Sequence, residues 1–91
     1  MPEDDRYRYR PDVLQQLLRH GVRPTGRTPP TLVRDFVRDL YKYEIRRLRD
    51  SYVRGDFAKV EYATRVDTLR RQYPVLALYA REFLERAHDG T

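Results

Sequence analysis

The residues best suited to chemistry in this sequence are cations that recur at three- or four-residue spacing between positions 34 and 49. At about 100° per residue, this spacing places side chains on one face of a helix. This basic stripe consists of Arg34, Arg38, Lys42, Arg46 and Arg49. Because arginine forms planar, paired hydrogen bonds with carboxylates and phosphates, the basic stripe predicts contact with an acidic protein surface or a nucleic-acid backbone.

Further arginines lie before the basic stripe. The run RYRYR alternates cations with tyrosines, a composition suited to phosphate contacts and base stacking, although the preceding Glu3, Asp4 and Asp5 weaken its positive field. Residues 21–28 form a connector whose arginines precede a predicted helix N-terminus, which is a favourable place for an anion. The additional candidate partner or phosphate contacts are therefore Arg6, Arg8, Arg10, Arg23 and Arg27.

One carboxylate departs from the pattern. Glu44 falls near the centre of the apolar arc of the same helix, between Leu40 and Leu48. A buried carboxylate without a partner is costly, so we expect Glu44 to be paired. Two interpretations stay open: a structural ion pair with an arginine of another helix, or a carboxylate that faces a pocket or a bound partner.

No arrangement of residues indicates catalysis or cofactor binding. The two histidines, His20 and His88, are far apart in sequence, and the chain contains no cysteine. Nucleophile-elbow, phosphate-loop and dinucleotide motifs are absent from the sequence. We therefore expect a protein that is not an enzyme and has no cofactor, no metal site and no small-molecule substrate.

The basic stripe needs one long helix, predicted over about residues 29–54. Pro29 can occupy the first helical position, and Gly55 is a natural stop. The helix is amphipathic, with aliphatic and aromatic residues gathered opposite the cations. Its predicted apolar face comprises Val33, Phe36, Val37, Leu40, Tyr41, Ile45, Leu48 and Tyr52.

The other elements are also predicted to be helical, which gives an all-α fold class. A helix over about 57–73 carries an apolar seam suited to antiparallel packing on the long helix. Short helices are expected over about 11–20 and 74–87, which completes a small four-helix domain spanning 11–87. Residues 1–10 are predicted to be a flexible basic arm, and residues 88–91 a frayed tail.

Composition limits the cellular setting. The 91-residue chain has a net charge of +5, and the excess of basic residues lies in residues 1–54. No apolar run approaches the length of a membrane span, and the N-terminus lacks a signal-peptide core. We therefore expect a cytoplasmic protein with no membrane partner.

Two functions fit these features. The first is a non-catalytic protein–protein interaction module, an adaptor or small subunit that can self-associate and uses the long basic helix. Its eight tyrosines and many arginines favour this function, because both residue types are enriched in interface centres. The alternative is a nucleic-acid-binding protein that contacts phosphates through the Arg34–Arg49 stripe and the RYRYR arm. The interleaved aspartates and the absence of a helix-turn-helix pattern argue against this alternative.

Overall fold

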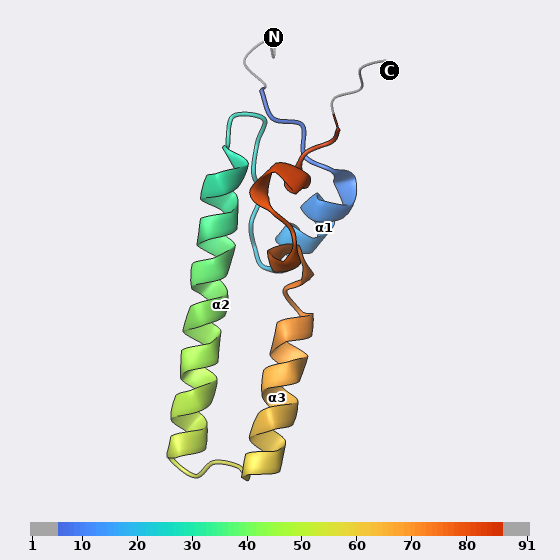
Figure 1. The fold of residues 1–91 in the computed structure, drawn as a ribbon. Helices are drawn as coiled ribbons and strands as arrows, with labels where there is room; N and C mark the ends of the chain where they lie inside the picture. The colour runs from blue at the N-terminus through green and yellow to red at the C-terminus, as the bar shows by residue number, and fades with distance from the viewer. Residues whose placement is uncertain (1–5, 87–91) are drawn as a thin grey trace.

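The chain forms an elongated body in which one long helix supports the other elements. The computed structural model describes residues 6–86, with principal extents of 54 × 25 × 16 Å. This range contains helices α1 (Pro11–Arg19), α2 (Pro30–Val53) and α3 (Lys59–Arg71), followed by the short 3₁₀ helices η2 (Pro74–Ala77) and η3 (Ala80–Phe83). Helices α2 and α3 lie side by side and run in opposite directions, whereas α1, η2 and η3 gather around the N-terminal half of α2 (Figure 1).

The all-α prediction is confirmed for the described residues, but the predicted last helix is wrong. Within 74–87, η2 and η3 are separated by extended backbone at Leu78 and Tyr79, and residue 87 lies outside the described range. A continuous helix would have pointed Leu78 away from the other apolar side chains. The break instead lets Leu78 pack on the same core as Val75 and Phe83, so burial outweighs helical hydrogen bonding here.

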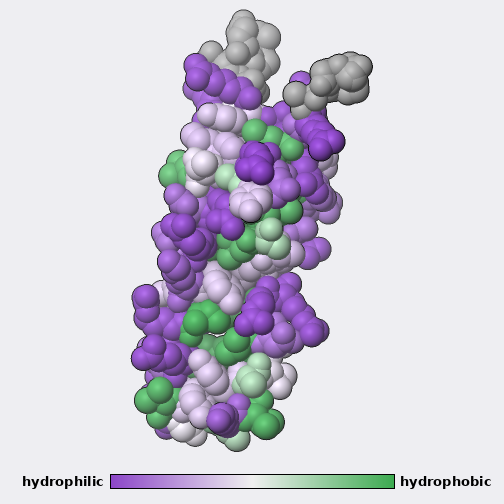
Figure 2. Space-filling view, in the orientation of Figure 1, coloured by the Kyte–Doolittle hydropathy of each residue, from purple (hydrophilic) through white to green (hydrophobic). Residues whose placement is uncertain are grey.

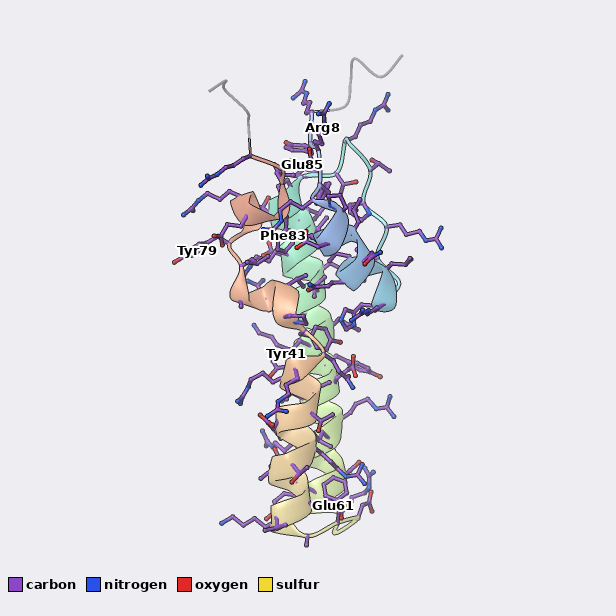
Figure 3. The ribbon with its side chains drawn as sticks, turned by 90° about the vertical axis from the view of Figure 1, so that its right-hand side faces the viewer. Arg8, Tyr41, Glu61, Tyr79, Phe83 and Glu85 are labelled. Carbon is purple, nitrogen blue, oxygen red and sulfur yellow. The ribbon has the colours of Figure 1, made fainter. Side chains whose placement is uncertain are left out.

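The hydrophobic core lies at the N-terminal half of α2, where four elements meet. The side chains of Val13, Leu17, Val37, Val75 and Phe83 are completely buried, and they come from α1, α2, η2 and η3. Figure 3 shows Phe83 directed inward between the helices, whereas Tyr79, four residues earlier, points outward. The two 3₁₀ helices therefore supply core residues and are not a loose tail.

The predicted flexible arm is also wrong where the structure describes it. Residues 6–10 lie against the domain, and the side chain of Tyr9 is only 6% exposed. The amide of Arg10 donates to the carbonyl of Phe83 at 2.9 Å, and the amide of Glu85 donates to that of Arg8 at 2.8 Å. These bonds flank an isolated antiparallel bridge between Tyr9 and Leu84. The reason is burial of the Tyr9 ring; residues 1–5 and the predicted tail at 88–91 lie outside the described residues.

The far end of the α2–α3 hairpin is stabilised by aromatic stacking. Gly55 adopts a φ of 85°, a left-handed conformation that costs glycine little and ends α2 as expected. Tyr52 and Tyr62 stack across the turn with ring centroids 4.5 Å apart, and Phe57 lies 6.4 Å from both rings. Figure 2 shows hydrophobic residues between the two helices and hydrophilic residues along their outer flanks.

Membership of η2 in the core can be tested with a matched pair of valines. Val75→Ala removes completely buried methyl groups, so we expect it to lower the free energy of unfolding by about 2 kcal/mol. Val60→Ala removes the same atoms from a side chain that is 80% exposed, and its effect should stay within about 0.5 kcal/mol. Urea denaturation followed by circular dichroism measures both. Equal effects would show that η2 is not part of the core.

Candidate functional site

The first residue of the basic stripe has a structural role. The Nε atom of Arg34 donates to the carbonyl of Leu78 at 2.7 Å, and its terminal nitrogen donates to the carbonyl of Leu76 at 2.9 Å. The break between η2 and η3 leaves these carbonyls without helical partners, and such groups are costly when buried. Arg34 therefore fastens the 3₁₀ segment to α2 and is not a free partner contact, which corrects the prediction.

Arg38, the second residue, is held by neighbouring acids. A terminal nitrogen lies 3.3 Å from Asp35, and Nε lies 3.8 Å from Asp39. The second distance is too long for a hydrogen bond, and Nε is buried without a hydrogen-bond partner among the described residues. The guanidinium thus sits at the edge of the packed face of α2, and it is less accessible than the sequence pattern predicts.

The other three residues of the basic stripe are exposed, as the sequence pattern predicts. Lys42, Arg46 and Arg49 lie on the outer surface of α2, and within residues 6–86 the structure gives them no ion pair. The basic stripe is therefore reduced to three accessible cations. They occupy the C-terminal half of the helix, at least about 18 Å along its axis from Pro30.

Arg10 joins the N-terminal segment to the rest of the domain. Its guanidinium forms a 2.7 Å ion pair with Asp12 and donates to the carbonyl of Glu82 at 3.0 Å. The hydrogen bond from Arg10 lowers the pKa of the Asp12 carboxyl below its usual value. The guanidinium of Arg10 thus makes its contacts within the domain, with Asp12 and Glu82, and not with a partner.

The other candidate arginines lie at the end of the molecule opposite the hairpin turn. The amides of Arg6 and Tyr7 both donate to the carbonyl of Gly26 at 2.9 Å, which brings Arg6 and Arg27 to the same shallow groove. Arg8 is exposed beside Glu85, and Arg23 is exposed on the connector. The structure therefore does not join these arginines to the basic stripe as one continuous surface.

Glu44 has a hydroxyl partner instead of the predicted arginine. Its half-buried carboxylate accepts a short hydrogen bond from the hydroxyl of Tyr73, the residue between α3 and η2. Its other neighbours line an open groove of about 400 Å³ between α2 and α3, so the pocket-facing interpretation describes its position correctly. No ion pair between Glu44 and an arginine occurs within residues 6–86. The groove contains both Arg47 and Arg65, but Arg65 is bound to Glu61 at 2.7 Å.

Tyr73 is the centre of a larger cluster. His20, just after α1, stacks on its ring at 4.1 Å and donates from Nε2 to the carbonyl of Gln72 at 2.7 Å. Tyr41 of α2 meets the same ring edge-on at 5.1 Å. Burial raises the pKa of the Tyr73 hydroxyl, and the adjacent negative charge of Glu44 raises it further. Through its hydroxyl and its ring, Tyr73 thus joins the ends of α1 and α3 to α2.

The residues that the sequence analysis missed form an apolar row on the outside of α2. We call this row the outer stripe; it consists of Leu32, Phe36, Leu40 and Tyr43. Leu40 is half-buried, but Leu32, Phe36 and Tyr43 are 60%, 56% and 53% exposed. Their spacing of four, four and three residues is the signal that indicates a second apolar face. Phe36 was instead assigned to the core, whereas Leu40, assigned there as well, does pack partly against the core and forms the edge of the outer stripe.

A groove extends the outer stripe toward the connector. It has a volume of about 320 Å³ and is lined mainly by apolar side chains of α2 and the connector, among them Val22, Pro24, Leu32 and Phe36. At the other end, the guanidinium of Arg47 lies over the ring of Tyr43, 5.9 Å from its centroid. The outer stripe thus has an apolar recess at one end and an arginine-flanked aromatic ring at the other.

Comparison with known proteins assigns no family to the chain. No family model matches it, and no curated protein or solved structure shows significant similarity to it. Within residues 6–86, no group of histidine or acidic side chains is arranged to hold a metal ion, and no helix is long and apolar enough to cross a membrane. Inference about function therefore depends on the surfaces described above.

The structural role of Arg34 can be separated from that of the exposed cations. Arg34→Ala should lower the free energy of unfolding by about 2–3 kcal/mol, because the carbonyls of Leu76 and Leu78 lose charged donors. Arg49→Ala on the same helix removes an exposed cation and should change stability by less than about 0.5 kcal/mol. Urea denaturation of both variants provides the measurement. A neutral Arg34→Ala variant would contradict the role assigned to Arg34.

The protein should lose stability in alkali. Burial, and to a smaller extent Tyr7, raises the pKa of Tyr9 to about 12, whereas in an unfolded chain a tyrosine has a pKa of about 10. The contribution of neutral Tyr9 is therefore fully present below pH 10 and declines as the pH rises toward 12, by roughly 2 kcal/mol. The hydroxyl of Tyr73, with its raised pKa, adds to the decline.

Thermal melts between pH 8 and pH 12 test this expectation. Tyr9→Phe and Tyr73→Phe should each reduce the slope of stability against pH above pH 10, because each variant lacks one of the two buried hydroxyls. Tyr43→Phe is the matched control. Tyr43 is 53% exposed, so removal of its hydroxyl should leave the slope of stability against pH unchanged. Identical slopes in all variants would show that the hydroxyls of Tyr9 and Tyr73 do not cause the loss of stability in alkali.

Proposed function

We propose that this protein is a non-catalytic helical interaction module, an adaptor or small subunit, that binds protein through the outer stripe of α2. The observation that supports the proposal is the exposure of Leu32, Phe36 and Tyr43 in one row on a regular helix. An amphipathic helix whose second apolar face is uncovered is the usual anchor of helix–helix and helix–groove complexes. Isolated exposed apolar residues are normal, but a continuous row of them favours an interface.

The chemistry of the outer stripe suits an interface centre. Phe36 and Tyr43 are large rings with few rotatable bonds, so binding orders them at low entropic cost. The apolar recess beside Leu32 can accept a partner side chain, and Arg47 can retain its contact with Tyr43 at the rim. Because α2 also carries the core residues Val33 and Val37, the outer stripe is displayed on a rigid element.

The alternative is nucleic-acid binding by the exposed part of the basic stripe. The observation in its favour is the exposure of Lys42, Arg46 and Arg49 without an ion pair among residues 6–86. With Arg34 bonded to backbone carbonyls and Arg38 paired with neighbouring aspartates, three phosphate contacts would give a log–log salt slope of only about −2.7. Such weak, sequence-independent binding makes this function the second candidate.

Photo-crosslinking in cells tests the main proposal. A benzoylphenylalanine residue at position 43 lies in the outer stripe, so we expect ultraviolet light to join it covalently to a protein. The same residue at position 60 is the control, because Val60 is 80% exposed on α3 and outside the outer stripe. Phe36→Asp in the position-43 protein should abolish the adduct, since it places a charge at the centre of the contact.

Two outcomes would reject the proposal. Equal adducts from positions 43 and 60 would show non-specific contact, and the absence of any protein adduct from position 43 would show that the outer stripe is not an interface. A nucleic-acid adduct, together with binding lost at high salt and in the triple variant Lys42→Glu, Arg46→Glu, Arg49→Glu, would establish the alternative.

A further inference from the structure

The charges beside the outer stripe change sign at its midpoint. On the flank of α2 that faces solvent, Asp35 and Asp39 precede Leu40, whereas Lys42 and Arg46 follow it. The two aspartates are 58% and 70% exposed, so they have accessible oxygens in addition to those that approach Arg38. Within two turns on either side of Leu40, the flank thus changes from acidic to basic.

Such a pattern is complementary to itself only when a second helix runs in the opposite direction. If two copies of α2 lie antiparallel with the two-fold axis beside Leu40, residue i of one lies within about one residue of the level of residue 80 − i of the other. Asp35 then lies next to Arg46 of the second copy, and Asp39 next to Lys42, with the same contacts repeated by symmetry. A parallel alignment would place like charges together, which is unfavourable.

The same register brings the apolar residues together. Leu40 faces its own equivalent across the axis, and Phe36 lies beside Tyr43 of the second copy. Leu32, at the recess next to the connector, meets the aliphatic part of the second copy's Arg47. The contact extends from Leu32 to Arg47, a length of about 22 Å, and follows ordinary helix packing.

One further charge fits this arrangement. The first turn of α2 contains no acidic residue, and its N-cap, Pro29, provides no side-chain hydrogen bond. In the antiparallel register, Asp50 of the second copy lies at the level of the first turn of α2, where a negative charge compensates the helix dipole. The acidic residue that interrupts the basic half of α2 therefore has a favourable position in the pair.

We infer that the occupant of the outer stripe is a second copy of this chain, and that the protein forms an antiparallel, two-fold symmetric dimer through α2. This inference rests on the proposed function, since it names the partner of the same surface. Charge complementarity favours a second copy as the partner, because α2 carries both the acidic half and the basic half of the flank. An antiparallel copy of α2 therefore presents the opposite charge at each position.

Sedimentation equilibrium of the purified full chain provides the first test. The weight-average mass should rise from 11.0 kDa toward twice that value as concentration increases. Phe36→Asp should weaken association at least 100-fold, whereas Val60→Asp, at an exposed position on α3, should leave it unchanged. A dimer that persists in Phe36→Asp uses another surface and would overturn the inference.

Charge reversal tests the orientation. The double variants Asp35→Lys, Asp39→Lys and Lys42→Asp, Arg46→Asp should each dimerise at least 10-fold more weakly than the original chain, because the paired positions 35, 39, 42 and 46 then carry like charges. Mixed together, they should form a heterodimer, since opposite flanks then face each other. Recovery on mixing also shows that both variants are folded; failure to recover would overturn the antiparallel register.

The absence of cysteine from the sequence allows a disulfide test. Leu40→Cys lies at the predicted axis, and it should form a disulfide dimer on mild oxidation because equivalent residues there come within disulfide reach. Leu32→Cys is the control: it should stay monomeric under the same conditions, since the antiparallel register separates the two copies of residue 32. Equal crosslinking of both variants would indicate a parallel pair and overturn the inference.

The outcomes also separate this inference from the proposed function. A chain that stays monomeric at millimolar concentration, yet gives a crosslink from position 43 to a different protein in cells, overturns the second-copy inference and leaves the interaction module intact. A monomeric chain with no protein adduct from position 43 rejects both.

Discussion

The fold depends on the side chain of Tyr73, because three helices meet at its ring. Its hydroxyl is bonded to Glu44 of α2, its face is covered by His20 after α1, and its edge meets Tyr41. Tyr73 also occupies the position where α3 ends and the 3₁₀ segment begins. The contacts of Tyr73 therefore fix the direction in which the chain leaves α3. This direction leads η2 and η3 to the core.

Arginine contributes to this fold mainly as a donor to backbone and to neighbouring acids. Arg34 binds two carbonyls that the break after η2 leaves without partners, and Arg10 connects the N-terminal segment to η3. These contacts reduce the number of cations available to a partner below the number in the sequence. The net charge of +5 therefore overstates the accessible positive surface.

Sequence periodicity was sufficient to predict the elements that consist of regular helix. Local patterns and the glycine stop located α1, α2 and α3 because repeated apolar spacing and end signals act within each segment. The last helix could not be predicted in this way. Its local pattern is helical, but burial of Leu78 beside Phe83 depends on contacts with α1 and α2 that are distant in sequence.

The candidate site was predictable to a smaller extent. A helical wheel gives the direction of each side chain but not which neighbours cover it, so Arg34 was expected to be exposed and Phe36 to be buried. The partner of Glu44 could not be predicted either, since Tyr73 lies 29 residues away and nothing in the sequence distinguishes it from the other tyrosines. The outer stripe was visible as spacing, but only the structure shows which apolar row remains uncovered.

The bridge between Tyr9 and Leu84 has a consequence for the order of folding. Bringing these residues together closes a loop of about 75 residues, with an entropic cost of roughly 4 kcal/mol, whereas the α2–α3 hairpin closes a loop of only a few residues. The hairpin therefore has the kinetic advantage. Because Tyr9 and Phe83 are both core residues, the core is completed last, when the two distant segments meet.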